Sequence, residues 1–194
     1  MARQAAARGL AAMVFDFRGH GASEGVMDAG AAADVTSAAH TLLVKSAAPW
    51  VAGRGSSLGA FWLLRAASAD PGLFRSLVVL CPADEASLLR GLDHFAARDA
   101  LADDSEGFAG RFDVPGLRAF WQQTDLFATA RGMRRVLVAH TRDDEDVPFT
   151  VGRRLAAGLA PPSRFIALPR GGHKGAQRSP LVAGATLDWV LEHA

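Results

Sequence analysis

The chain has 194 residues, 49% of them hydrophobic, with a formal net charge of +1 and one cysteine, Cys81. This size and composition predict one folded domain with a substantial core and exclude a disordered chain. The balanced charge argues against a nucleic-acid partner, and a single cysteine excludes an internal disulfide. With no signal-peptide pattern and no run as long as a membrane span, we expect a cytoplasmic protein without a membrane partner. The sequence carries no signal for an oligomeric state.

Apolar runs that alternate with helical patterns predict an α/β fold. Residues 10–17 form a continuous apolar run, which is typical of a strand buried on both faces. Further strands are predicted at residues 50–54, 76–80, 136–140 and 165–168, with helices at residues 2–9, 28–48, 60–69, 150–159 and 179–193. We therefore expect a mostly parallel sheet of about five strands, flanked by helices, within a single domain over residues 1–194. Residues 84–133 lack a clear strand and predict a small helical, lid-like insertion.

The stretch GSSLG at residues 55–59 lies between a predicted strand and a predicted helix. A serine in the middle of G-x-S-x-G can stand exposed on a tight turn, with glycines where strand and helix pass closely. The register selects Ser57 rather than Ser56 as the nucleophile. The Leu58 backbone N–H, at the start of the helix, is then placed to hold a developing negative charge.

A serine hydroxyl becomes a good nucleophile only when a base takes its proton and a third group orients that base. The strand at residues 136–140 is followed by HTRDDEDVP, and the strand at 165–168 is followed by GGH, which ends at His173. In a parallel sheet these loops leave from the same edge as Ser57, so the three segments converge. Asp144 is the favoured acid, with Asp143 and Asp146 as alternatives.

These motifs together resemble the α/β-hydrolase superfamily of serine hydrolases, of the esterase and lipase kind. Residues 14–25, VFDFRGHGASEG, are similar to that family's D-x-R-G-H-G-x-S turn, and the acid loop is similar to H-G-x-x-D-x-x-V-P, with Thr141 in place of glycine. The order Ser, Asp, His is also the one expected of the family. The resemblance makes Asp144 the triad acid and His20 structural, although His20 lies in a glycine-rich turn. His140 is expected to be a surface, lid or strand-end residue.

The resemblance implies cleavage of a carboxylic ester, or of a related small-molecule acyl substrate, through an acyl-enzyme. Ser57, His173 and Asp144 form the triad, and no cofactor or metal is implied. Phe61, Phe120 and Trp121 are the candidate substrate-binding residues. The aromatic residues of the insertion fit equally well as a cover over the core, so both interpretations stay open.

The resemblance also implies that the family's first three strands are absent, which gives a truncated α/β-hydrolase fold. One of the absent loops would supply the second oxyanion N–H. Three explanations of the absent strands are open. We expect that the natural start of the protein lies upstream, and that in the chain as given residues 10–17 pair directly with residues 50–54. The third explanation is that the chain is a degenerate fragment. The alternative function is a catalytically impaired or non-catalytic α/β-hydrolase-like binding domain.

Overall fold

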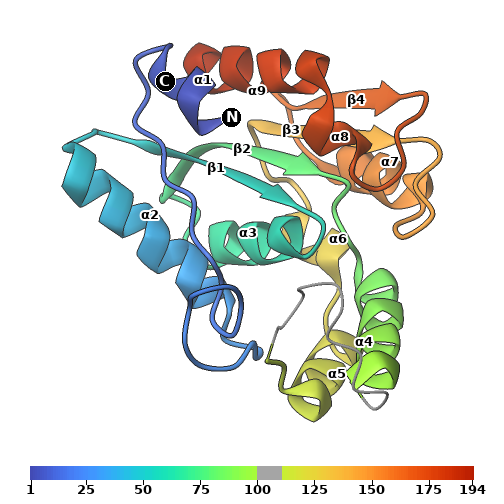
Figure 1. Ribbon diagram of the computed structural model, residues 1–194. Helices are drawn as coiled ribbons and strands as arrows, with labels where there is room; N and C mark the ends of the chain where they lie inside the picture. Colours follow the sequence, from blue (N-terminus) through green and yellow to red (C-terminus); the bar gives the residue numbers. More distant parts are fainter. Residues whose placement is uncertain (100–110) are drawn as a thin grey trace.

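A parallel sheet organises the computed structural model, which describes residues 1–99 and 111–194 (Figure 1). Its four strands are β1 (Val51–Ser56), β2 (Phe74–Leu80), β3 (Val136–Thr141) and β4 (Arg164–Leu168), and they lie side by side in chain order. All neighbouring pairs are parallel, so the four carboxyl ends meet at one edge. The predicted α/β class is confirmed.

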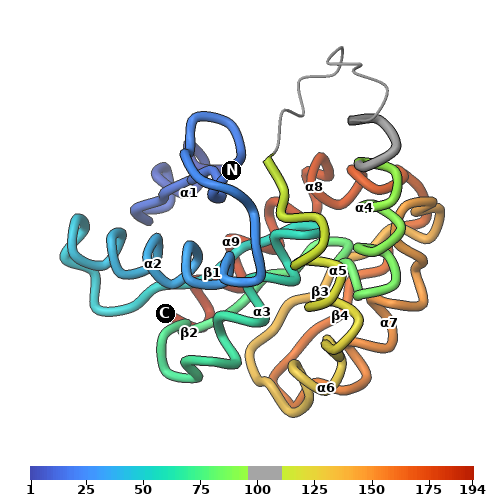
Figure 2. The backbone as a smooth tube through the Cα atoms, turned by 90° about the horizontal axis from the view of Figure 1, so that it is seen from below, coloured from blue at the N-terminus to red at the C-terminus, as the bar shows by residue number. Residues whose placement is uncertain are grey.

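Helices cover both faces of this sheet. Their bounds are α1 (Ala2–Ala6), α2 (Ala32–Ser46), α3 (Leu58–Ala69), α4 (Glu85–Asp99), α5 (Val114–Gln122), α6 (Leu126–Ala130), α7 (Phe149–Gly158), α8 (Gly175–Arg178) and α9 (Pro180–Glu192). In Figure 2, α1 and α2 lie toward the β1 side of the molecule and α7 toward the β4 side. The short helix α8 is one that the sequence pattern did not predict. No helix among the described residues has the length and hydropathy needed to cross a membrane.

The two central strands are buried on both faces, which explains their continuous apolar sequences. Successive side chains of a strand point to opposite faces. Val136 and Val138 therefore pack into the larger core, with residues of α2, α3 and α7. Leu137 and Ala139 pack into the smaller core, against Trp189 of α9.

The predicted insertion at residues 84–133 contains α4, α5 and α6. Helix α4 packs against α5, while α6 packs against α3 and α7. The helices α5 and α6 each begin at an aspartate whose side chain accepts a hydrogen bond from a backbone N–H of the first turn. Residues 100–110 of the predicted insertion lie outside the described residues. The described part carries an isolated bridge between Met27 and Phe112 but no strand.

The strand predicted at residues 10–17 is not formed, and this expectation was wrong. These residues have no sheet pairing, and within the described residues β1 pairs with β2 alone, so the sheet has four strands rather than about five. An apolar run becomes a strand only when a neighbouring backbone supplies its hydrogen bonds. Here Val14 is 83% exposed, and the segment stands off from β1.

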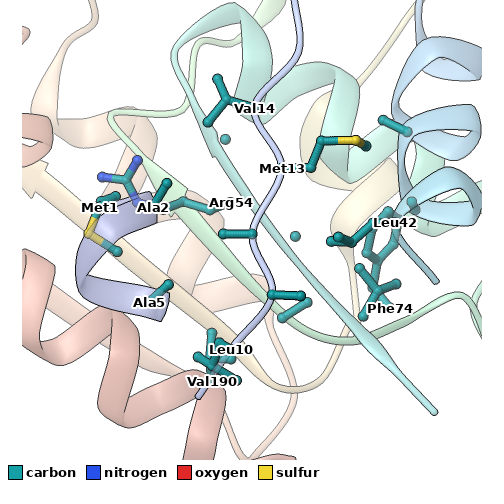
Figure 3. Close-up of a pocket in the computed structure, with 18 of the residues that line it drawn as sticks. Met1, Ala2, Ala5, Leu10, Met13, Val14, Leu42, Arg54, Phe74 and Val190 are labelled. Atoms are coloured by element: carbon teal, nitrogen blue, oxygen red, sulfur yellow. The ribbon is translucent and has the colours of Figure 1, made fainter. Parts of the chain in front are cut away.

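A cavity of about 760 Å³ separates this N-terminal segment from β1 (Figure 3). Its walls come mainly from the N-terminal segment, α2, β1, the start of β2 and α9, and include Met13, Leu42, Phe74 and Val190. The turn that follows the N-terminal segment is fixed more firmly, because the Arg18 guanidinium contacts the Asp34 carboxylate at 2.7 Å and Asp28 at 3.0 Å. The outer edge of β1 therefore faces an apolar hollow instead of a fifth strand.

Candidate active site

The turn between β1 and α3 holds Ser57 in a strained conformation. Its φ of 51° and ψ of −121° lie in a region that L-residues rarely adopt, at a cost of about 1–3 kcal/mol. The Ser57 N–H donates to the Leu80 carbonyl at 2.9 Å, and the Ser57 carbonyl accepts from the Ala60 N–H at 3.0 Å. These bonds to β2 and to the first turn of α3 hold the residue at the carboxyl edge of the sheet.

The two glycines of the turn have different roles. A Cβ at Gly55 would lie 2.5 Å from the Gly59 carbonyl oxygen and 2.8 Å from the Ala60 nitrogen, so only glycine fits there. At Gly59 the nearest atom to such a Cβ is a Phe17 ring carbon at 3.8 Å, which is ordinary contact. The close approach predicted from the motif is therefore present on one side of Ser57.

Leu58 is the first residue of α3, and the N-terminus of that helix lies next to Ser57. No hydrogen bond within the described residues uses the Leu58 N–H. The positive end of the helix dipole points to the same place. This N–H is thus available to an oxyanion that forms on an acyl group at Ser57.

Asp144 and His173 form a buried pair at the same edge. The His173 Nδ1 lies 2.9 Å from Oδ2 and 3.1 Å from Oδ1 of Asp144, whose side chain is fully buried. The Oδ1 atom also accepts from the Asp146 N–H at 3.1 Å and the Val147 N–H at 2.9 Å. A buried carboxylate needs such donors, because burial removes its hydrogen bonds to water and other donors must replace them.

The two other candidate acids lie elsewhere. Asp143 is exposed, and its carboxylate accepts from the N–H groups of Gly171 and Gly172, each at 3.0 Å. These two hydrogen bonds lower the pKa of Asp143 below its ordinary value. Asp146 is exposed and contributes backbone atoms to the loop. The structure thus brings Asp144, and neither neighbour, to His173.

The loop that carries His173 is tied to the end of β3. The Thr141 hydroxyl donates to the Gly172 carbonyl at 2.6 Å. A Cβ at Gly175 would come within 2.7 Å of the Thr141 methyl group, so this glycine makes room for the threonine. Thr141 stands where the resemblance leads one to expect glycine, and it gives the histidine loop an additional anchor. Its spacing from Gly172 in the sequence gave no sign of this contact.

Cys81 lies under the Asp144–His173 pair at the end of β2. Its sulfur, an Asp144 oxygen and a His173 nitrogen lie within 4.8 Å of one another, which is a grouping that could approach a metal ion. Burial, assisted by the Asp144 charge, raises the pKa of the Cys81 thiol to about 11. Metal ligation needs a thiolate, whereas a protonated thiol suits packing against a carboxylate. The grouping therefore fits a hydrogen-bonded network better than a metal centre.

The predicted substrate-binding aromatics lie together inside the molecule. Phe61 and Trp121 are buried, and Phe120 is half-buried. The rings of Phe120 and Trp121 each meet the Phe61 ring edge-to-face, with 6.4 Å between the ring centroids. Trp62 stacks on Phe120 at 5.6 Å. The residues are part of the larger core and do not line the cavity beside β1. A role for them in substrate contact stays a prediction.

His20 and His140 both contact other residues of the fold. The His20 Nδ1 lies 3.2 Å from the Arg18 carbonyl oxygen, and its ring meets Phe112 edge-on at 5.1 Å. His140 lies at the end of β3, which is one of its three expected places, but it is completely buried, and its Nε2 lies 3.2 Å from Asp144 Oδ2. A histidine that ends an apolar strand four residues before an acid is the one signal that could have indicated this contact.

The Ser57 hydroxyl and His173 reach the same edge from β1 and from the loop after β4. Within the described residues, the structure forms no hydrogen bond between these two side chains. In free enzymes, catalytic hydrogen bonds are often long and tighten only when substrate binds. The arrangement supplies a half-buried serine on a strained turn, a histidine hydrogen-bonded to a buried acid, and a backbone N–H at a helix start that is unused within the described residues.

Solved structures with the same fold identify the class. The structure of Rv0554 from Mycobacterium tuberculosis superposes with a TM-score of 0.74 at 25% identity, covering 99% of this chain and 83% of that one. The α/β hydrolase GrgF from Penicillium sp. sh18 gives 0.70 at 15% identity, covering 99% and 83%. A monoacylglycerol lipase from Paleococcus ferrophilus gives 0.66 at 16% identity, covering 93% and 83%. No family model and no curated protein matches the sequence.

The parallel sheet and its flanking helices define the α/β-hydrolase fold. The chain shares this fold with the α/β hydrolases among these structures.

Proposed function

We propose that the chain is a serine hydrolase that cleaves a carboxylic ester or a related small acyl substrate. The observation that carries this proposal is the buried Asp144 carboxylate, 2.9 Å from the His173 Nδ1, at the sheet edge where Ser57 occupies a strained turn. The names of several solved neighbours, which include a hydrolase, a lipase and an esterase domain, support the same class of reaction.

In the proposed reaction, the Ser57 Oγ attacks the ester carbonyl carbon while the Nε2 of His173 takes the hydroxyl proton. Asp144 holds the Nδ1–H of the resulting imidazolium and stabilises its charge. The tetrahedral intermediate places its negative oxygen near the Leu58 N–H. Collapse breaks the bond to the alcohol oxygen, which takes the proton from His173, and leaves an acyl group on Ser57.

Water completes the cycle by the same chemistry. His173 removes a proton from a water molecule, the oxygen of which attacks the acyl carbon. The second tetrahedral intermediate expels Ser57, and His173 returns the proton to the serine oxygen. The products are a carboxylic acid and an alcohol, and no cofactor takes part.

A fluorophosphonate probe tests the proposal directly, since it forms a bond only with an activated serine. The parent chain should be labelled and should hydrolyse a p-nitrophenyl ester. Ser57→Ala should lose both, with kcat lower by at least about 10³-fold. Ser56→Ala is the matched control, because this adjacent hydroxyl is buried without a partner and should be dispensable. Labelling that survives Ser57→Ala would mean that the nucleophile is misassigned, while an unlabelled parent would favour a non-catalytic binding domain.

A further inference from the structure

A second histidine, His140, contacts the same carboxylate oxygen of the proposed triad acid as His173 does. It is the last residue but one of β3, and its side chain leaves the strand on the same face as Val136 and Val138, toward α7. The imidazole is completely buried. Its Nε2 lies 3.0 Å from the Val147 carbonyl oxygen and 3.2 Å from Oδ2 of Asp144.

These neighbours determine which nitrogen of His140 carries the proton. A carbonyl oxygen and a carboxylate oxygen can only accept hydrogen bonds, so the Nε2 must be the N–H. The Nδ1 is buried and has no hydrogen-bond partner within the described residues. Protonation there would create a buried, unpartnered N–H and a charge, which is costly.

The electrostatics agree with a neutral ring. Burial lowers the pKa of His140, and the nearby His173 lowers it further, against the opposing effects of the Val147 carbonyl and the Asp144 charge. Asp144 and His173 are the titratable groups that act on His140 electrostatically, and the Cys81 sulfur lies within 4.8 Å of an Asp144 oxygen. On the α7 side the ring meets Gly152 and, edge-on at 5.8 Å, Phe149, and neither titrates.

Helix α7 is shaped to admit this ring. Gly152 is buried in the first half of α7, where glycine is a poor helix former. A Cβ at this position would collide with the Nδ1 of His140. By contrast, a Cβ at Gly158, the last residue of the same helix, would meet no atom within 4 Å. The absence of a Cβ at Gly152 thus leaves the space that the imidazole occupies beside Asp144.

We infer that His140 is a positioning residue for Asp144, which it holds as a neutral hydrogen-bond donor, so that no second positive charge competes with His173 for the acid. This inference rests on the proposed function for its consequences in catalysis. His140 anchors the acid in two ways: directly at Oδ2, and through Val147, whose carbonyl it binds and whose N–H holds Oδ1. A charged donor in its place would compete with His173 for the carboxylate.

Two substitutions of His140 separate hydrogen bonding from space filling. Glutamine can place a neutral N–H near the position of the imidazole Nε2, whereas leucine fills similar volume without a donor. Per labelled Ser57, His140→Leu should lower kcat about ten- to hundredfold with little change in KM, because the acid is displaced by a fraction of an ångström. The acid limb of its kcat/KM profile should move to higher pH, since the Asp144 charge is then shared with one donor fewer. His140→Gln should stay within about threefold of the parent, with the parent's acid limb.

Gly152→Ala provides a second, independent displacement, because it moves the His140 ring without removing its N–H. It should lower kcat in the same direction as His140→Leu, and Gly158→Ala should leave kcat unchanged. A purely structural role would reduce melting temperature and the labelled fraction, but not the rate per labelled site or the acid limb. Parent-like kinetics per site in His140→Leu, or equal losses in the Leu and Gln variants, would overturn the inference.

Imidazole ¹H–¹⁵N spectra keep the test independent of hydrolysis. In the parent, His140 should stay in the neutral Nε2–H form between about pH 5 and 8, a range in which an unperturbed histidine titrates. The His173 Nδ1–H resonance should shift in His140→Leu and Gly152→Ala, and keep its parent position in His140→Gln and Gly158→Ala. If the parent is not labelled by fluorophosphonate, the proposed function fails, and these spectra alone decide the role of His140. The inference about His140 would be contradicted by a His140 ring that is doubly protonated near neutral pH, or by a His173 Nδ1–H resonance that stays unchanged in all four variants.

Discussion

The carboxyl edge around Asp144 and the outer edge of β1 are built in opposite ways. At the first, four donor atoms from four different residues make five contacts with the oxygens of one buried carboxylate. At the second, a strand edge faces a cavity of about 760 Å³, and the apolar segment across it makes no ladder. The difference shows that the fold fixes its polar site by many short, directional contacts, while it leaves an apolar boundary loosely packed.

The largest expected effect separates two adjacent aspartates. Asp144→Asn should lower kcat by about 10⁴-fold, because a neutral amide cannot stabilise the His173 imidazolium and presents donors to the Asp146 and Val147 N–H groups. Asp143→Asn is the matched control and should stay within about tenfold of the parent, since it holds only the backbone of the histidine loop. Rates of p-nitrophenyl ester hydrolysis per labelled serine measure both. Equal losses would remove the distinction between the two carboxylates.

The two glycines beside Ser57 test whether the inner side of β1 is as tightly built as the acid loop. Gly55→Ala should destabilise the chain by about 1–3 kcal/mol, because its Cβ would overlap the backbone of Gly59 and Ala60. Gly59→Ala should be neutral or stabilising by up to about 1 kcal/mol, since the site is open and lies in α3. Urea unfolding followed by circular dichroism gives both values. A stable Gly55→Ala variant would show that the turn can relax.

The hydrogen bonds of Asp143 predict a pH dependence of stability in the histidine loop. The folded-state pKa of Asp143 is lowered, so its contribution is present above the unfolded pKa, about 3.9, and is lost as the pH falls through the folded value. The melting temperature of the parent should therefore exceed that of Asp143→Asn above about pH 5, and the two should converge in acid. Thermal unfolding of both proteins from pH 3 to 8 measures this. A difference that grows toward low pH would have the wrong sign.

The smallest effect is expected in the N-terminal segment. Val14→Ala should change the free energy of unfolding by no more than about 0.5 kcal/mol, because this side chain is 83% exposed. The same substitution at Val138, which is fully buried between β2 and β4, should cost about 2 kcal/mol or more. The midpoints of denaturant unfolding of the two variants, each relative to the parent, measure both effects. A large loss in Val14→Ala would indicate that the segment packs more firmly than its exposure indicates.

The sequence determined those features that short windows encode. Four strands lie within a few residues of their predicted positions, and the G-x-S-x-G stretch forms the expected turn between β1 and α3. The positions of Asp144 and His173 after successive strands were also sufficient to predict that these two residues meet, because parallel strands deliver their loops to one edge. Residue type could not choose among Asp143, Asp144 and Asp146, since all three carry the same carboxylate, and it was the spacing to Val147 and Pro148 in the resembled motif that favoured Asp144.

Tertiary structure decided what depends on a partner elsewhere in the chain. Residues 10–17 have the composition of a buried strand, but they make no ladder with β1, whose edge faces the cavity, so they stay irregular. His140 became a buried neighbour of Asp144 because Gly152, on a different element, leaves room for its ring. Sequence sets the chemistry that each residue can offer. Packing alone decides which donors and acceptors meet, since burial makes an unpaired polar group costly and a paired one specific.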